Sequence, residues 1–235
     1  MTDANTKLKG IICYYSGSGN TRLACQYIAN NIKNAEFKLF NIVKDGVPDF
    51  DAYDVAGFAC FTDFIDPPYL VWTFLQKIKR QNNKSAFVFN TYGFINGKTQ
   101  VTLDKWASAR GFKVLGGHSL HTPESYPPMI AGGRGNEQAP NERELKEFNR
   151  FIDELERSFS LLLVGQKVGK KTSVSRMLIG LLPAFSRTRS RRDMGVKFVD
   201  AELCKECHTC EKLCPYGAIK LGPKPIFDMD KCYGC

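Results

Sequence analysis

Six of the nine cysteines in this chain of 235 residues lie within its last 32 residues, and their spacing strongly constrains how that part can fold. The first four follow the pattern C-x2-C-x2-C-x3-C and precede a proline: Cys204, Cys207, Cys210, Cys214 and Pro215. Three thiolates at this spacing fit on one tight turn and can bind three irons of a cubane cluster, while a short helical turn carries the fourth thiolate away. Zinc is the competing metal, but it is typically held by two separated C-x2-C pairs. We therefore predict that this segment folds around an iron–sulfur cluster.

A second pair, Cys232 and Cys235, follows a short strand predicted at Ala218–Leu221. The arrangement resembles the second half of a bacterial two-cluster ferredoxin, in which the fourth cysteine of a run binds the other cluster. The resemblance implies that Cys204, Cys207 and Cys210 hold one cluster. It equally implies that Cys214, Cys232 and Cys235 hold a second. Each set is one ligand short, so we expect the natural protein to continue through a further C-x3-C-P and to carry two [4Fe-4S] clusters at full length.

The formal net charge of +9 comes mostly from one segment of the chain. Between Ser160 and Gly195 there are eight basic residues and one acidic residue, so the remainder is nearly neutral. We interpret residues 161–195 as a basic linker, followed by a small α+β module at residues 196–235. The alternative is a segment that binds nucleic acid or an anionic membrane, because the apolar run Met177–Phe185 lies beside several arginines. We favour the linker and expect no nucleic-acid partner.

No apolar run reaches the roughly 20 residues that a membrane-spanning helix needs. The beginning of the chain, Met1–Gly10, lacks the apolar core of a signal peptide. We therefore expect a cytoplasmic protein without a transmembrane segment. Thiols stay reduced in that compartment, which favours metal ligation over disulfides for the crowded cysteines.

The first 160 residues alternate between two kinds of apolar pattern. Short runs rich in β-branched and aromatic residues predict strands at Leu8–Tyr15, Phe37–Val43, Val55–Thr62, Ala86–Thr91 and Lys113–Leu120. Apolar residues at helical spacing predict helices at Asn20–Lys33, Tyr69–Arg80, Thr99–Arg110 and Asn141–Leu155. The last of these opens with Asn141 and Glu144, which have the spacing of a capping box. Only a turn-rich stretch, Lys44–Tyr53, joins the second and third strands, so we expect one crossover helix to be short or missing. The pattern predicts an α/β domain at residues 1–160 with a parallel sheet covered on both faces.

A hydroxyl-rich loop stands between the first strand and the first helix: Ser16, Gly17, Ser18, Gly19, Asn20 and Thr21. Its glycines let the backbone turn tightly, and the free N–H groups of the helix start attract an anion. A nucleotide-triphosphate loop would need a lysine, and a dinucleotide loop would need a small residue where Arg22 stands. We therefore predict a binding loop for a phosphomonoester. A simple helix cap is the alternative.

The loop, its position after the first strand and the strand–helix order resemble the flavodoxin family. That family has a doubly wound sheet with strand order 2-1-3-4-5 and binds FMN where the order reverses. The resemblance implies a five-stranded parallel sheet and an FMN site here. It also implies that the loops after the third and fourth strands hold the isoalloxazine ring. Those positions are Phe61, Thr62 and Asp63, and Asn90, Thr91, Tyr92, Gly93 and Phe94. Asp63 near the ring would disfavour an anionic reduced flavin.

The combination resembles the flavodoxin–ferredoxin fusion proteins of anaerobic bacteria, the EFR-type ferrodoxin family. The resemblance implies electron transfer between iron–sulfur clusters and bound FMN, with an acidic redox partner protein attracted by the basic segment. The alternative is a flavin-dependent reductase of a small acceptor, such as a quinone or an enone. Cys13, Cys25 and Cys60 lie in predicted strands or on an amphipathic helix, so we interpret them as small buried apolar residues.

Replacing Cys207 with serine tests the cysteine assignment. Loss of one of three adjacent cluster ligands should abolish the visible iron–sulfur absorbance and leave the flavin absorbance in place, because the two cofactors bind separate segments. Absorption spectra of anaerobically purified protein measure both. Cys25→Ala, which removes a thiol outside the module, should keep both absorbances. A Cys207→Ser protein that retains the iron–sulfur spectrum would contradict the assignment.

Overall fold

The computed structural model describes residues 7–169 and 195–233, and the chain divides into two compact units. One comprises Met1–Ser125 with Arg134–Phe185, and the other comprises Tyr126–Gly133 with Ser186–Cys235. Most of the expected basic linker and the candidate ligand Cys235 lie outside the described residues. No helix within the described ranges combines the length and the apolar character that a membrane crossing requires.

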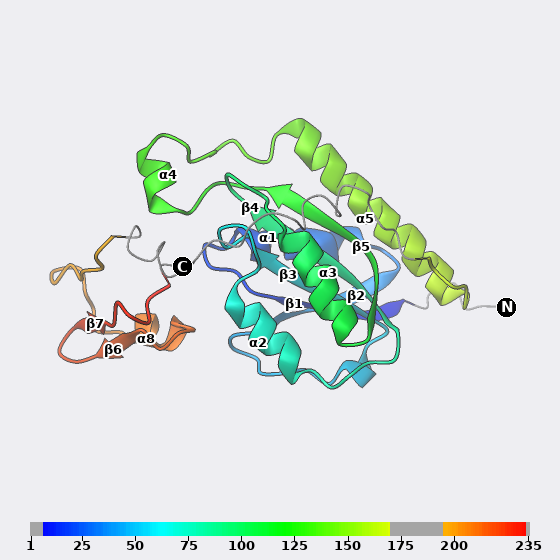
Figure 1. The fold of residues 1–235 in the computed structure, drawn as a ribbon, viewed down its shortest axis with the longest axis horizontal. Coiled ribbons are helices and arrows are strands. Elements are labelled where there is room, and N and C mark those ends of the chain that lie inside the picture. Colours follow the sequence, from blue (N-terminus) through cyan, green and yellow to red (C-terminus); the bar gives the residue numbers. More distant parts are fainter. Residues whose placement is uncertain (1–6, 170–194, 234–235) are drawn as a thin grey trace. The chain divides into compact units, whose positions relative to one another are not determined.

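Five parallel strands form the sheet of the larger unit: β1 (Leu8–Tyr14), β2 (Ala35–Asn41), β3 (Val55–Phe61), β4 (Lys84–Tyr92) and β5 (Phe112–His121). Their order is β2-β1-β3-β4-β5 (Figure 1). The expected five-stranded parallel sheet is therefore confirmed. Because all five strands run in the same direction, the loops that follow their carboxyl ends lie along one edge of the sheet. The strand order reverses between β1 and β3.

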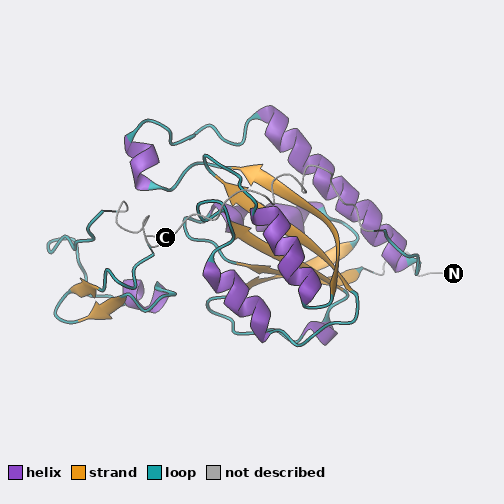
Figure 2. Cartoon of the chain, in the orientation of Figure 1, coloured by secondary structure: helices purple, strands orange, loops and turns teal. Residues whose placement is uncertain are grey.

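Helices cover both faces of this sheet (Figure 2). On one face, α1 (Asn20–Asn31) and α5 (Glu142–Leu163) bury Ile28, Phe148 and Phe159 against Phe87 and Phe89 of β4. On the other face lie α2 (Tyr69–Lys77) and α3 (Thr99–Ala109), whose apolar residues pack on β3 and β4. The three inner strands β1, β3 and β4 are buried on both sides, which explains their nearly continuous apolar sequences.

The connection between β2 and β3 differs from the other crossovers. It contains a single turn of 3-10 helix, η1 (Phe50–Ala52), where the other connections carry an α-helix. Asp49 caps this turn, because its side chain accepts a hydrogen bond from the N–H of Asp51 at 3.0 Å. The expectation of a short crossover element is confirmed.

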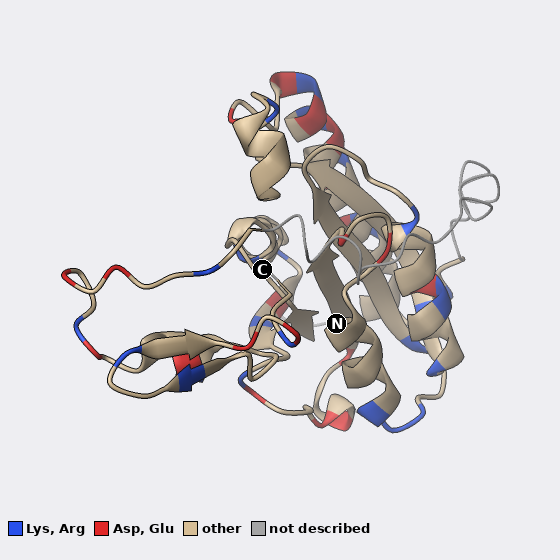
Figure 3. Ribbon diagram, turned by 60° about the vertical axis from the view of Figure 1, so that its left-hand side comes forward, with Lys and Arg blue, Asp and Glu red and all other residues tan. Residues whose placement is uncertain are grey.

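Helix α5 begins with the predicted capping box and runs further than its sequence pattern indicates. Asn141 accepts from the N–H of Glu144, and the Glu144 carboxylate accepts from the N–H of Asn141. The helix ends at Leu163, not at Leu155 as predicted, because its buried face continues through Phe159. Acidic and basic residues lie side by side along its exposed face (Figure 3), with Arg143 and Glu147 at 3.1 Å and Arg150 and Glu154 at 3.5 Å.

The cysteine-rich module contains little regular structure. Helix α8 (Thr209–Leu213) is one turn long, and β6 (Ile219–Leu221) pairs antiparallel with β7 (Pro225–Phe227). The strand expected at Ala218–Leu221 is confirmed. The rings of Tyr216 and Tyr233 stack at 4.1 Å with an interplanar angle of 5°. With so few buried apolar residues, a module of this size needs additional cross-linking to be stable on its own.

His118 on β5 lies among aromatic rings between the sheet and α5. Its ring is parallel to those of Phe89, Phe148 and Phe151, with centroids between 5.3 and 6.4 Å apart. Burial lowers the pKa of His118 from 6.5 to about 4, although the nearby Glu147 carboxylate opposes the shift. The folded protein therefore holds His118 neutral at a pH where the unfolded chain would bind a proton.

This pKa predicts acid sensitivity of the larger unit. The free energy of unfolding should be unaffected by His118 above about pH 6.5 and should fall between pH 6.5 and 4, by about 3 kcal/mol at most. Urea titrations of wild type and His118→Phe across this range measure the effect. The variant should lose this part of the pH dependence, whereas His208→Gln, at an exposed histidine, should retain it. The prediction would be contradicted if the free energy of unfolding fell equally between pH 6.5 and 4 in wild type and in His118→Phe.

Candidate functional site

The loop between β1 and α1 presents backbone N–H groups that have no backbone partner. Gly19 has φ +104°, and no atom lies within 4 Å of the position that a Cβ would take there. Within the described residues, no backbone carbonyl accepts from the amides of residues 17–21; the first such bond joins Leu23 N–H to the carbonyl of Gly19. Five adjacent amide donors at a helix start fit the oxygens of a phosphate.

The side chains of this loop divide between the surface and the interior. Ser18 is exposed, and the Ser16 hydroxyl accepts from the N–H of Arg22 at 3.3 Å, which leaves its own proton available. Asn20 points across the edge of the sheet, and its Nδ2 donates to the carbonyl of Pro123 at 3.1 Å. Thr21 is buried beneath the loop with 1% of its surface exposed. The outer side of the loop is thus exposed to solvent at Ser18, and its inner side is buried at Thr21.

Asn90, at the end of β4, connects the loops that the sequence analysis assigns to the flavin ring. Its Nδ2 donates to Thr62 Oγ1 and to Asn96 Oδ1, each at 3.0 Å. Its Oδ1 accepts from Ser119 Oγ at 2.6 Å. The Asn90 side chain is fully buried with its hydrogen bonds made, so it holds the loops from beneath. No sequence pattern marks Asn96 or Ser119 as members of this network.

The loop after β3 packs partly inward. The rings of Phe61 and Tyr15 have centroids 5.2 Å apart; Tyr15 belongs to the core on the α2 and α3 face, and the half-buried Phe61 packs against that core. Thr62 donates from its N–H to the carbonyl of Thr91 at 2.7 Å, which joins this loop to β4. Asp63 pairs with Asp66 through the backbone in a tight turn. The structure therefore brings together the two loops that were predicted to hold the isoalloxazine ring. Contact of Phe61 and Asp63 with that ring stays a prediction.

Tyr92 stacks on His121 at the ends of β4 and β5. Their ring centroids are 5.2 Å apart with an interplanar angle of 17°, and His121 Nδ1 lies 2.9 Å from Glu144 Oε1. Burial raises the pKa of the Tyr92 hydroxyl, and the carboxylates of Glu144 and Glu147 raise it further. The sequence alone gives His121 no chemical role, and the structure shows that it is the residue on which Tyr92 stacks.

Gly93 allows a second segment to approach the loop after β4. A Cβ at Gly93 would lie 2.8 Å from Glu124 Cα, so a side chain there would force the two segments apart. The Glu124 carboxylate accepts from the N–H of Phe94 at 2.9 Å and from the N–H of Ser125 at 2.8 Å. Phe94 itself is half exposed, with the Arg134 guanidinium 5.7 Å from its ring centre. No sequence pattern marks Glu124 as a partner of this loop.

The five described cysteines of the second unit lie at or near the surface. Cys207 is exposed, and Cys204, Cys210, Cys214 and Cys232 are half-buried, all as free thiols. Hydrogen bonds from Thr209 lower the pKa of the Cys207 thiol, with a smaller contribution from Lys212. The N–H of Ala218 donates to Cys214 Sγ at 3.3 Å.

These thiols do not form a ready-made cage. Among residues 7–169 and 195–233, no three side chains of histidine, cysteine, aspartate or glutamate converge on one metal position. Glu206 and His208 have positive φ, which folds the segment between the cysteines into a tight loop. The donor set nevertheless fits an iron–sulfur cluster, because four accessible thiols share one short loop and its following turn. In such modules, metal binding and folding are coupled.

The three remaining cysteines lie in the core of the larger unit and are fully buried. Burial raises the pKa of the Cys13, Cys25 and Cys60 thiols well above the usual range. They are therefore neutral and unreactive, as the sequence analysis expects.

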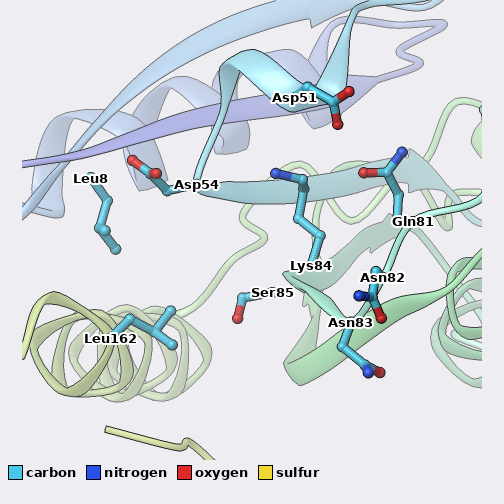
Figure 4. Close-up of a pocket in the computed structure, with 9 residues that line it drawn as sticks. All are labelled: Leu8, Asp51, Asp54, Gln81, Asn82, Asn83, Lys84, Ser85 and Leu162. Carbon is cyan, nitrogen blue, oxygen red and sulfur yellow. The ribbon is translucent and has the colours of Figure 1, made fainter. Parts of the chain in front are cut away.

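A pocket of about 510 Å³ lies at the opposite edge of the sheet, where the strands begin (Figure 4). It is lined by Leu8, Asp51, Asp54, Gln81, Asn82, Asn83, Lys84, Ser85 and Leu162. Two of its three charged side chains hydrogen-bond to nearby backbone. Asp54 accepts from the N–H of Lys9 at 2.7 Å, and Lys84 Nζ donates to the carbonyl of Tyr53 at 2.5 Å. Asp54 and Lys84 thus hydrogen-bond to backbone at the edge opposite the phosphate-type loop.

Comparison with known proteins gives one match to the cysteine run and another over a longer stretch of the chain. Residues 197–220 match the family model described as a 4Fe-4S binding domain. An uncharacterized protein of Methanocaldococcus jannaschii is 29% identical over 147 residues, which are 61% of this chain and 95% of that protein.

Solved structures establish the fold of the larger unit. A flavodoxin from the domain Archaea superposes with a TM-score of 0.50 and 16% identity, covering 65% of this chain and 99% of its own. The rubredoxin oxygen:oxidoreductase of Desulfovibrio gigas superposes with a TM-score of 0.51 and 16% identity, covering 66% of this chain and 37% of its own. At these identities the likeness shows the fold alone. The chain thus carries a flavodoxin-like α/β domain followed by a 4Fe-4S-type domain.

Replacing Asn90 with leucine tests how far this edge of the sheet depends on the buried amide. The change leaves the hydroxyl of Ser119 and the amide of Asn96 without their shared partner, so the free energy of unfolding should fall by about 3 kcal/mol. Urea titration measures this change. Asn82→Leu, at an exposed position, is the matched control and should shift the free energy by less than about 0.5 kcal/mol. Equal effects of both substitutions would contradict the role of Asn90.

Proposed function

We propose that the chain transfers electrons between iron–sulfur clusters in its C-terminal module and an FMN bound at the carboxyl edge of its α/β sheet. One observation carries this proposal. The lysine-free loop of open amides at residues 17–21 lies at the point where the strand order reverses, on the same chain as a 4Fe-4S-type cysteine run.

The residues at this edge fit FMN in two respects. The amides of residues 17–21, with the hydroxyls of Ser16, Ser18 and Thr21, would bind the phosphate. The loops after β3 and β4 would hold the ring, since Asn90 and Thr62 fix them side by side. Tyr92, held by His121, would offer its aromatic ring for stacking. The archaeal relative in fold is itself named a flavodoxin.

The ligand sets proposed for the clusters follow the two-cluster ferredoxin pattern. Cys204, Cys207 and Cys210 would bind one cluster, and Cys214 would bind a second. Cys232 and Cys235 would share that second cluster with Cys214. The N–H of Ala218, which donates to Cys214 Sγ, would stabilise the thiolate and raise the potential of the iron it binds.

Joining the two centres on one chain has a physical advantage. Bound FMN would accept one or two electrons, whereas each cluster passes one electron at a time. Because the two domains are tethered, each holds the other at an effective concentration that depends on the linker and not on the amount of protein. The eight basic residues between Ser160 and Gly195 would attract an acidic redox partner protein.

A second candidate function is a flavin-dependent reductase of a quinone or an enone. The observation that favours it is the contact of His121 with both Tyr92 and Glu144, which places a hydrogen-bonded imidazole next to the proposed ring loops. Glu144 occupies Nδ1 of this imidazole, so Nε2 would be the ring nitrogen left to exchange a proton with the acceptor.

Anaerobic purification with FMN, iron and sulfide quantified together tests the electron-transfer proposal. We expect one FMN per chain together with iron and sulfide. After dithionite reduction of the clusters, flavin reduction followed by stopped-flow absorbance should have a rate constant unchanged over a tenfold range of protein concentration.

The same experiment separates the alternatives. A rate that rises in proportion to protein concentration would contradict electron transfer within one chain. Turnover of a quinone or enone that saturates with acceptor concentration, and that is lost in His121→Ala while FMN stays bound, would instead favour the reductase. Colourless protein that binds zinc and no FMN would overturn both.

A further inference from the structure

Two threonine hydroxyls meet in the interior beneath the phosphate-type loop. Thr21 lies in the first turn of α1, and Thr91 lies 70 residues later near the end of β4. Their Oγ1 atoms are 2.8 Å apart, and each residue has only 1% of its surface exposed. This is the one side-chain hydrogen bond between the described residues of α1 and those of β4.

The two hydroxyl groups carry two protons. One lies in the hydrogen bond between them, and the other is available for a further hydrogen bond. Each hydroxyl can donate a single hydrogen bond and accept two. If Thr21 donated to Thr91, it would have no proton for a ligand. If Thr91 donates to Thr21, the Thr21 proton remains available next to the open amides of residues 17–21.

The backbone around Thr91 is fixed, so its hydroxyl can act as a rigid partner. Thr91 pairs with Phe61 of β3 on one side and with Leu120 of β5 on the other. Its carbonyl also accepts the N–H of Thr62 at 2.7 Å. A donor held by strands on both sides keeps its position when the loop above binds or releases a ligand.

Packing alone does not require this pair of hydroxyls. Thr99, in the first turn of α3, is also fully buried, and its hydroxyl has no hydrogen-bond partner among the described residues. The chain thus tolerates a buried threonine hydroxyl without a partner. Two valines at positions 21 and 91 would fill the same volume, so the hydroxyl pair has a use beyond filling space.

We propose that Thr91 is a positioning residue for the phosphate of the bound mononucleotide. It donates to Thr21 Oγ1 and thereby directs the Thr21 proton to a phosphate oxygen. The hydrogen bond from Thr91 also polarises the Thr21 hydroxyl and strengthens the bond that it donates. This inference rests on the proposed function, because it assumes that the loop binds a phosphomonoester. Thr91 itself does not touch the ligand.

The comparison of FMN with riboflavin isolates the phosphate. In Thr91→Val, the dissociation constant for FMN should rise by about tenfold, whereas that for riboflavin should stay unchanged. Flavin fluorescence quenching, measured on flavin-free protein, gives both constants. Thr91→Ser keeps the hydroxyl and should restore FMN affinity to within about twofold of wild type. The matched control Thr99→Val should change neither constant.

A double variant tests whether Thr91 acts through Thr21. Thr21→Val together with Thr91→Val should lose no more FMN affinity than Thr21→Val alone, because both changes remove the same hydrogen bond to phosphate. Additive losses would overturn the inference. So would an unchanged ratio of the two dissociation constants in Thr91→Val, or an equal loss for FMN and riboflavin.

Thermal melts of the flavin-free variants show whether each is folded, and Thr91→Ala replaces Thr91→Val if the latter does not fold. Failure of the proposed function gives a different result. Wild-type protein would then bind neither flavin, or would bind FMN and riboflavin equally well. Wild-type protein that prefers FMN, with a preference that Thr91→Val does not alter, leaves the proposed function standing and contradicts the role of Thr91 alone.

Discussion

The carboxyl edge of the sheet depends on the buried amide of Asn90. Three hydrogen bonds join this side chain to Thr62, Asn96 and Ser119, which belong to three different segments of the chain. Burying an amide costs free energy when one of its hydrogen bonds is missing, and it makes the surrounding structure rigid when all of them are formed. The network therefore favours one arrangement of the loops.

Parallel strands concentrate the candidate chemistry at a single edge. The loops after β1, β3 and β4 all leave the sheet in the same direction, and the order reverses between β1 and β3. The opposite edge carries charged residues too, but there Asp54 and Lys84 hydrogen-bond to nearby backbone. The direction of the strands thus separates the candidate site from the part that supports it.

Cysteine has two distinct roles in this chain. In the α/β domain, burial keeps Cys13, Cys25 and Cys60 neutral, so that they behave as small apolar residues. In the C-terminal module, the described cysteines are exposed or half-buried free thiols, in a segment with few buried apolar residues. One residue type is therefore buried in one domain and accessible in the other.

The sequence by itself determined the order of strands and helices, the short crossover after β2, the capping box of α5 and the cysteine run. Each of these follows from the spacing of residue types along a short stretch of chain, which can be analysed without the tertiary structure. The tertiary structure alone decided which side chains meet: Asn96 and Ser119 at Asn90, Glu124 at Gly93, and Thr91 at Thr21. It also extended α5 to Leu163, because contacts with the sheet outweigh the end of the local pattern. A hydrogen bond between residues far apart in the chain produces no periodic pattern in the sequence of either segment, so only the folded structure shows it.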